Sequence, residues 1–339
     1  MVEYVRSAFG RFADPDEHLR RHECSVLRDP AGGWRIQDGA IDARVANRAW
    51  LEGIAAARIL ENAGNQVRTH DLFHAAAVGR GGRAVVLAGD SGHGKSLITL
   101  GLLQRGWAYL SDEVCALSAA GPRIDPFPKA LEVAPAGFAT LGLPAPEATP
   151  CRRGKVLVDP PAAHLGLPPA AVVLLACGSR PPRGAAVRTL RVAVHRDDPS
   201  AIDAVASCTG VLEVRRSPSS LPHPVLALTA DDRFEAWRLD EILGAHGVLI
   251  TAVDSDPPEP TSFVDEPALE SLPSSAGIVA LLARLRGRNA LAETIARRFG
   301  GSFSAFVDSV AMRLAGVRFF RMRVGRLHAA LDLLDGLVP

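Results

Sequence analysis

The chain has 339 residues, 47% of them hydrophobic and 22% charged, which is enough for one large globular domain or two ordinary ones. Its formal net charge of +1 at pH 7 does not favour binding to nucleic acid or to an anionic membrane surface. The longest apolar run, 170–177, is too short to span a bilayer, and no signal-peptide core follows the N-terminus. The five cysteines lack C-x-x-C spacing, so reduced thiols and a cytoplasmic location are expected.

The first 65 residues are predicted to form a small β-rich layer followed by a helix. Short strands are expected at 22–27, 34–37 and 41–45, because β-branched and apolar residues there are separated by turn residues. A helix is expected over 47–62, with Asn47 as its N-cap. We therefore expect an N-terminal layer over 1–65 and a main domain over 66–339.

A phosphate-binding loop is predicted between a buried strand at 83–88 and a helix at 97–103. The segment matches the pattern G-x-x-x-x-G-K-[ST], the Walker A motif, at every fixed position; its residues are Gly89, Asp90, Ser91, Gly92, His93, Gly94, Lys95 and Ser96. In such a P-loop, backbone N–H groups and the helix N-terminus hold an anion. We expect Lys95 to reach the β- and γ-phosphates and Ser96 to bind Mg²⁺. A glycine-rich turn that binds nothing is the alternative, but it leaves both side chains unexplained.

Candidate catalytic groups lie on both sides of this loop in the sequence. His74 is expected on a neighbouring strand, from which its side chain could project toward the phosphates; simple packing is the alternative. Asp112 and Glu113 follow an apolar strand at 107–111, expected beside the loop strand. Carboxylates there suit Mg²⁺ binding or acceptance of a proton from a hydroxyl nucleophile. An ordinary polar turn is the alternative.

Lysine is rare in this arginine-rich chain, which makes the position of each lysine informative. Lys and Arg total 38, and all but Lys95, Lys129 and Lys155 are arginine. A compact ammonium can be needed where a guanidinium does not fit, so Lys129 is a candidate for neutralising phosphate, beside a third carboxylate at Glu132. The basic cluster at 152–155, Arg-Arg-Gly-Lys, has two possible interpretations. It is either a solvated loop or a group of charges that stabilises the phosphoryl group during transfer.

The rest of the chain is predicted to alternate strands and helices without a repeat. Strands are expected at 171–177 and 187–194, then a helix at 231–243 and a strand at 248–253. The Pro-rich acidic stretch 254–273 is expected to be an exposed loop. After it we expect helices at 276–286, 290–299 and 303–315, a strand at 317–323 and a last helix at 327–334.

Taken together, these motifs resemble the HPr serine kinase/phosphorylase superfamily, especially an HPr-kinase-like branch that includes lasso-peptide kinases. The loop has the Gly-Asp-Ser-Gly-x-Gly-Lys-Ser form that this family shares with PEP carboxykinases. His74 lies at the family's spacing before the loop, and 105–113 matches the segment R-G-x-x-x-[hydrophobic]-x-D-[DE]. The resemblance is dense over 70–135, patchy to 180 and present again at 315–337, whereas 215–310 is poorly matched.

The resemblance implies an α/β fold: a P-loop kinase core of the HPr kinase/PEP carboxykinase type with a mixed sheet and a helical C-terminal part. It implies that Asp112 receives or orients the acceptor proton, with Lys95 at the β- and γ-phosphates and His74 near the γ-phosphate or the acid pair. Glu113 and Glu132 are implied to assist Ser96 in binding Mg²⁺. The chain departs from the family at 134–138, where HPr kinases have an Arg-Gly-Ile-Gly-like run, so neither HPr as acceptor nor phosphorolysis follows.

The expected function is a serine kinase-like phosphotransferase that uses ATP and Mg²⁺. Its expected partner is a peptide or small protein with an acceptor serine, as in peptide modification; nucleic acid and membrane are not expected, and a homo-oligomer is left open. One alternative is a small-molecule kinase acting on free serine or a sugar. Another is a non-catalytic nucleotide-binding regulator, which would have no need of the acid pair at Asp112 and Glu113.

Overall fold

The computed structural model describes residues 24–30, 32–38, 41–45, 48–89, 93–127, 129–144, 155–161, 165–176, 187–218, 224–231, 234, 238–248, 250–255, 266–286 and 288–338. The chain divides into two compact units. The smaller unit contains the described residues of Asp16–Ile59 and Ser179–Pro260. The larger unit contains the described residues of Leu60–Gly178 and Thr261–Pro339, and it includes every candidate site residue that the structure describes.

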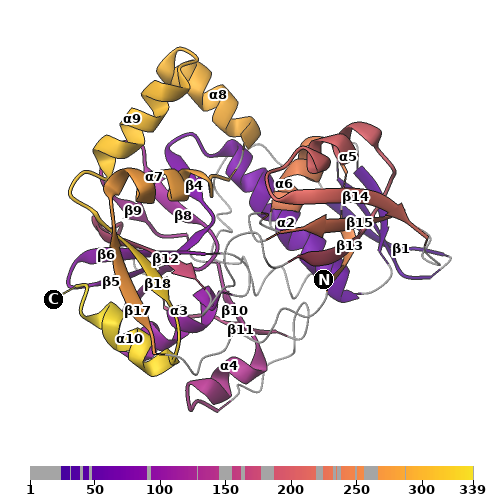
Figure 1. Ribbon diagram of the computed structural model, residues 1–339. Helices are drawn as coiled ribbons and strands as arrows, with labels where there is room; N and C mark the ends of the chain where they lie inside the picture. The colour runs from indigo at the N-terminus through magenta and orange to yellow at the C-terminus, as the bar shows by residue number, and fades with distance from the viewer. Residues whose placement is uncertain are drawn as a thin grey trace. The chain divides into compact units, whose positions relative to one another are not determined.

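The larger unit is built on a six-stranded mixed sheet with the order β17-β18-β12-β6-β5-β7 (Figure 1). Its strands are β5 (Ala75–Arg80), β6 (Arg83–Ala88), β7 (Ala108–Ser111), β12 (Pro169–Ala176), β17 (Ala268–Leu272) and β18 (Arg318–Arg323). Strands β6, β12 and β18 are parallel, whereas β5 is antiparallel to both β6 and β7, and β17 is antiparallel to β18. The expected α/β class with a mixed sheet is confirmed.

Helices cover both faces of this sheet because its central strands are apolar on both sides. Val85 and Leu87 of β6 pack into a core with α3 (Lys95–Gln104) and α10 (Leu327–Asp335). Val86 and Ala88, which point the other way, pack with α7 (Ser274–Leu282) and α9 (Phe303–Arg313). Helix α8 (Arg288–Phe299) packs against α9, with Phe299 and Phe306 in edge-to-face contact. The result is a three-layer α/β unit.

Two small sheets flank the main one. The first joins β4 (His70–Phe73), β8 (Cys115–Ser118) and β9 (Ile124–Asp125). The second pairs β10 (Leu131–Val133) with β11 (Val156–Val158) in antiparallel register. After β10 comes a short helix, α4 (Pro135–Thr140), which was not predicted and which begins on a proline suited to that position. Its Phe138 packs with Leu100 of α3, so α4 holds β10 against the loop helix.

The smaller unit contains the three predicted N-terminal strands, β1 (Cys24–Arg28), β2 (Trp34–Asp38) and β3 (Ile41–Val45), as an antiparallel sheet. Helix α2 (Arg48–Gln66) follows, and Leu51 and Ile54 from its first turns pack on this sheet. The predicted helix is confirmed, although its expected N-cap, Asn47, lies outside the described residues.

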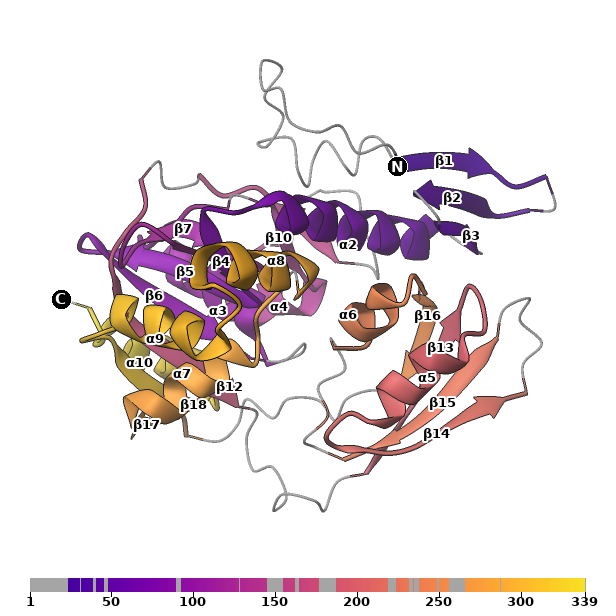
Figure 2. The same cartoon turned by 90° about the horizontal axis from the view of Figure 1, so that it is seen from above.

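The remaining elements of the smaller unit form a second antiparallel sheet with the order β14-β15-β13-β16. In chain order they are β13 (Arg188–Val194), α5 (Pro199–Ala206), β14 (Val211–Ser217), β15 (Val225–Ala230), α6 (Arg238–Ala245) and β16 (Ile250–Ser255). Figure 2 shows α5 lying across these strands. Residues of α5 and α6 share one core with β13 and β15. This βαββαβ arrangement is of the ferredoxin-like kind.

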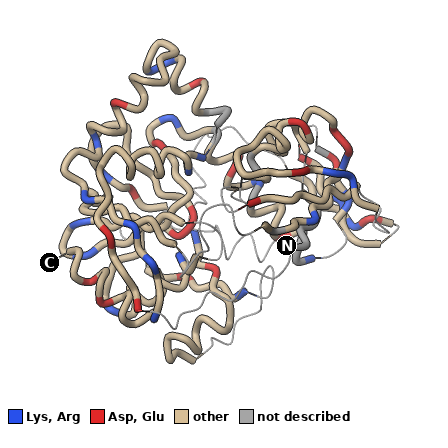
Figure 3. Tube along the Cα trace, in the orientation of Figure 1, with Lys and Arg blue, Asp and Glu red and all other residues tan. Residues whose placement is uncertain are grey.

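The structure differs from the sequence predictions mainly within 200–272. The stretches 211–217, 225–230 and 268–272 are strands, the last of them inside the stretch expected to be an exposed loop. The chain also divides differently from the expected boundary at residue 65, because 187–255 closes a core of its own in the smaller unit. Basic and acidic residues are interspersed along both units (Figure 3). Among the described residues, no helix is long and apolar enough to cross a membrane.

Candidate functional site

Strand direction brings the candidate residues to one end of the larger sheet. Strand β5 is antiparallel to β6, with Ala75 opposite Ala88, so His74 lies next to the start of the loop at Gly89. The same end of the sheet receives the last residue of β7, after which comes Asp112. The acids are thus on a strand parallel to the loop strand but separated from it by β5, rather than directly beside it as expected.

The described part of the loop has the geometry that its glycines allow. Gly94 has φ 83°, a left-handed conformation that favours glycine, directly before the first turn of α3. A Cβ on Gly89 would lie only 3.0 Å from Cβ of Leu175, so the chain passes close to the end of β12 there. Lys95 is buried and donates from Nζ to the Gly89 carbonyl oxygen. Its ammonium therefore links the first residue of α3 to the residue that follows β6.

Three of the predicted phosphate-binding residues, Asp90, Ser91 and Gly92, lie outside the described residues. His93 is described, and its Nδ1 lies 3.0 Å from the carbonyl oxygen of Leu175. Because a carbonyl oxygen can only accept, Nδ1 must carry the proton in this contact. The contact ties the loop to β12.

Ser96 and Asp112 meet at the centre of the site. Ser96 Oγ donates a hydrogen bond to Asp112 Oδ2 over 3.0 Å. Asp112 is only 5% exposed, and its Oδ1 has no hydrogen-bond partner among the described residues. Burial raises the pKa of Asp112 to about 6, with Glu113 adding to this rise and Lys129, Ser96 and Lys95 opposing it. Asp112 is thus a carboxylate with a pKa near neutral, in direct contact with the loop.

Lys129 holds the other two carboxylates. Its Nζ lies 2.9 Å from Glu132 Oε1 and 3.2 Å from Glu113 Oε2. Lys129 is 1% exposed and Glu132 3%, whereas Glu113 is partly exposed. Tyr109 donates from its hydroxyl to the Lys129 carbonyl oxygen over 2.5 Å, which fixes the backbone of this lysine. Of the three residues expected to bind Mg²⁺, only Ser96 lies against Asp112; Glu113 and Glu132 are paired with Lys129.

An arginine that the sequence did not single out completes the cluster. Nη2 of Arg286 donates to Nδ1 of His74 over 2.5 Å and lies 3.7 Å from Oε1 of Glu113. It reaches the site because 284–286 pairs with 72–74: the N–H of Arg286 donates to the Leu72 carbonyl oxygen, and that of His74 to the Arg284 carbonyl oxygen. No local pattern marks Arg286, since its partner is 212 positions away.

His74 is neutral in this environment. Burial lowers its pKa well below the usual value, and the charges of Arg286 and Lys95 lower it further. Neutrality agrees with the geometry, because an arginine can only donate and Nδ1 must therefore be the acceptor. His74 thus acts as a neutral acceptor that orients the Arg286 guanidinium.

The residues present fit a Mg²⁺ ion carried by a nucleotide. This ion prefers oxygen ligands and is usually held by one or two protein oxygens together with phosphates and water. Ser96 and Asp112 supply a hydroxyl and a buried carboxylate oxygen without a partner among the described residues. No group of three or more His, Cys, Asp or Glu side chains among the described residues could hold a metal by itself. The two oxygens of Ser96 and Asp112 therefore suit an ion that takes its other ligands from phosphate and water.

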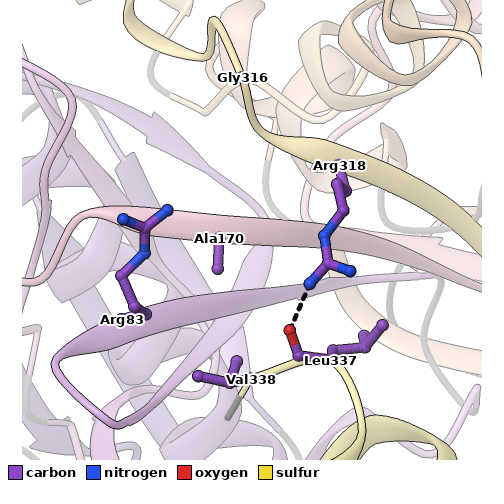
Figure 4. A pocket seen from close by; sticks show the side chains of 6 residues that line it. All are labelled: Arg83, Ala170, Gly316, Arg318, Leu337 and Val338. Atoms are coloured by element: carbon purple, nitrogen blue, oxygen red, sulfur yellow. Dashed lines mark hydrogen bonds between the residues drawn. The ribbon is translucent and has the colours of Figure 1, made fainter.

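Two further features lie away from this centre. The described part of the 152–155 cluster is Lys155, directly before β11; Arg152 and Arg153 lie outside the described residues. A hollow lined by Arg83, Arg318 and Leu337 opens near the amino ends of β6 and β18 (Figure 4). Arg318 donates there to the Leu337 carbonyl oxygen. Ligands of parallel sheets bind at the carboxyl ends of strands, so this hollow is separate from the loop site.

No protein-family model matches the chain, and no curated protein matches its sequence.

Proposed function

We propose that the protein is an ATP-dependent phosphotransferase that moves the γ-phosphoryl group to a serine-type hydroxyl of a peptide or small protein. The observation that carries the proposal is the contact between Ser96 of the loop and Asp112. A serine of a phosphate-binding loop beside a strand-end aspartate is the arrangement that P-loop enzymes use around a nucleotide-bound metal. That aspartate is buried, and its Oδ1 has no hydrogen-bond partner among the described residues, so the carboxylate can also orient an acceptor hydroxyl.

In the proposed reaction, the loop N–H groups and Lys95 hold the phosphates. Ser96 and Asp112 would hold Mg²⁺, which neutralises developing charge on the phosphoryl oxygens when it is bound. The acceptor oxygen forms a bond to the γ-phosphorus as the bond from that phosphorus to the β–γ bridging oxygen breaks, which releases ADP. The acceptor hydroxyl donates a hydrogen bond to the Asp112 carboxylate, which orients it, and its proton is released to water as the new bond forms. Positioning and charge neutralisation are the main demands of this reaction.

Arg286 is proposed to stabilise the transferring phosphoryl group. Its guanidinium is held by His74 on one side and Glu113 on the other, within the cluster that contains Lys95 and Asp112. A preoriented cation contributes more than a mobile one, because it does not have to be reorganised during the reaction. This role supplements the prediction from the sequence, in which His74 lies near the γ-phosphate or the acid pair.

The likeness to HPr-kinase-type enzymes remains part of this proposal, as does a peptide as the acceptor. The test is to treat Ser-containing peptides encoded near this gene with ATP, Mg²⁺ and protein, and to measure their masses. A gain of one phosphate on serine, lost with Asp112→Asn, is the expected result. Phosphorylation of free serine or a sugar, but of none of the peptides, would instead support the small-molecule kinase.

A further inference from the structure

We propose that the Lys129 ammonium is a built-in cation that occupies the place of a second divalent metal ion between Glu113 and Glu132, so that the site takes up one metal ion per nucleotide. The inference concerns the metal content of the proposed nucleotide site and in that respect rests on the proposed function. Its structural part, the occupation of a two-carboxylate position by an ammonium, can be tested without nucleotide.

The geometry of Lys129 is that of a shared counter-ion. Its nitrogen is within 3.2 Å of one oxygen of Glu113 and within 2.9 Å of one oxygen of Glu132. Two carboxylates that converge on one point are also the usual donors for a hard divalent cation, whose oxygen ligands lie about 2.0–2.6 Å away. An ammonium and a metal ion cannot share this position, since both need the same oxygen atoms.

Charge balance favours the ammonium over an additional metal ion. The cluster contains two carboxylates, Glu113 and Glu132, and two cations, Lys129 and Arg286, the latter 3.7 Å from Glu113. Its formal charge is therefore close to zero without any metal. In the nucleotide-free protein, adding a divalent ion would leave a net positive charge among side chains that are largely buried, which is costly in a low-dielectric environment.

The lysine is held in place by its surroundings rather than by the two acids alone. Its backbone carbonyl accepts from buried Tyr109, and its side chain is 1% exposed. Withdrawing a buried ammonium from two carboxylates would remove a close counter-charge from each of them, a strongly unfavourable change. Lys129 therefore stays where it is when nucleotide binds, and only the metal held by Ser96 and Asp112 enters.

The test is the number of Mn²⁺ ions bound, measured by electron paramagnetic resonance. Wild-type protein without nucleotide is expected to bind no Mn²⁺ at Glu113 and Glu132, and with a non-hydrolysable ATP analogue it should bind one per chain. Lys129→Met keeps the length of the side chain but removes its charge. It should gain one Mn²⁺ per chain without nucleotide, with an affinity at least tenfold above the wild-type background. Lys129→Met/Glu132→Gln should lose that ion, and Lys129→Arg should not bind it.

Two results would overturn the proposal. One is a second Mn²⁺ in the wild-type complex with the analogue that disappears in Glu132→Gln. The other is a folded Lys129→Met protein that binds no additional Mn²⁺. If Lys129→Met does not fold, the number of Mn²⁺ ions bound by the wild-type complex with the analogue still tests the proposal. Failure of the ATP analogue to bind at all would contradict the proposed function instead. The number of Mn²⁺ ions bound by nucleotide-free Lys129→Met would still test whether the Lys129 ammonium occupies a metal position.

Discussion

The hydroxyl of Ser96 donates to Asp112 Oδ2 over 3.0 Å and so links the first turn of α3 to the end of β7. Asp112→Asn keeps the size of that side chain but removes its charge, so it should reduce phosphoryl transfer by about 100-fold or more. At subsaturating Mg²⁺ the wild-type rate should fall below pH 6, because burial raises the pKa of Asp112 to about 6 in the metal-free protein and only the ionised form can bind the metal. A pH–rate profile measures this. An acid limb unchanged in Asp112→Asn would contradict the assignment.

The same substitution should make the nucleotide-free protein more stable. A carboxyl whose pKa rises from 3.8 to about 6 on folding stabilises the fold below pH 3.8, and that contribution is lost as pH rises through 6. At pH 8 the ionised Asp112 therefore costs stability, up to about 3 kcal/mol for a shift of this size. Urea unfolding at pH 8 should give a higher free energy of unfolding for Asp112→Asn than for wild type. A lower value would mean that the charge of Asp112 stabilises the fold.

Lys95→Met should weaken ATP binding by at least tenfold, because it removes the loop cation that would contact the phosphates. Lys95→Arg should not restore binding, since a planar guanidinium does not fit where the ammonium donates to Gly89. Isothermal titration calorimetry measures both. Arg83→Met is a matched control, because Arg83 is an exposed cation at the amino end of the loop strand. An equal loss of ATP affinity in Arg83→Met would mean that the nucleotide does not bind at the loop 89–96.

Arg286→Ala should raise the pKa of His74 and lower the rate of transfer. Burial is the largest cause of the depressed His74 pKa, and Arg286 is the next. Removing the guanidinium removes a nearby positive charge that disfavours protonation. NMR titration of ¹⁵N-labelled histidine should show His74 neutral at pH 6.5 in wild type and titrating at higher pH in the variant. A protonated His74 in the wild type at that pH would be inconsistent with the observed hydrogen bond.

Gly277→Ala should destabilise the larger unit through packing alone. A Cβ at Gly277 would lie 2.1 Å from Cδ1 of Phe319, so α7 or β18 must shift to accommodate it. Overpacking of this kind costs about 1–3 kcal/mol. Gly121→Ala is the control, because a Cβ there meets nothing within 4 Å. Thermal unfolding should show a lower midpoint for Gly277→Ala only; equal midpoints would show that the contact relaxes without cost.

Much of the larger unit could be predicted because its elements carry local signals. The loop has fixed glycines, and the helices at α7 to α10 show regular apolar spacing. The approach of His74 to Gly89 could be expected from the order of strand, loop and helix. In contrast, the strand at 225–230 was missed because its apolar run has no alternation and follows a proline-rich stretch.

Contacts between residues distant in the chain could not be predicted. Arg286 reaches His74 through pairing of 284–286 with 72–74, which no single stretch of sequence encodes. The pairing of Lys129 with Glu113 likewise depends on how β7 and β10 are placed around α3. The family resemblance implies Glu113 and Glu132 as metal ligands, whereas in the structure both carboxylates are paired with Lys129.

The most direct test of the central claim is the fate of ATP bound to the purified protein, which requires no knowledge of the acceptor. When no acceptor is present, water can occupy the acceptor position and take the γ-phosphoryl group. We expect Mg²⁺-dependent release of ADP and phosphate by the wild type, and none by Lys95→Met or Asp112→Asn. If the wild type binds ATP in a manner that requires Lys95 but returns it unchanged after prolonged incubation with Mg²⁺, that result contradicts phosphoryl transfer by this site and favours the nucleotide-binding regulator.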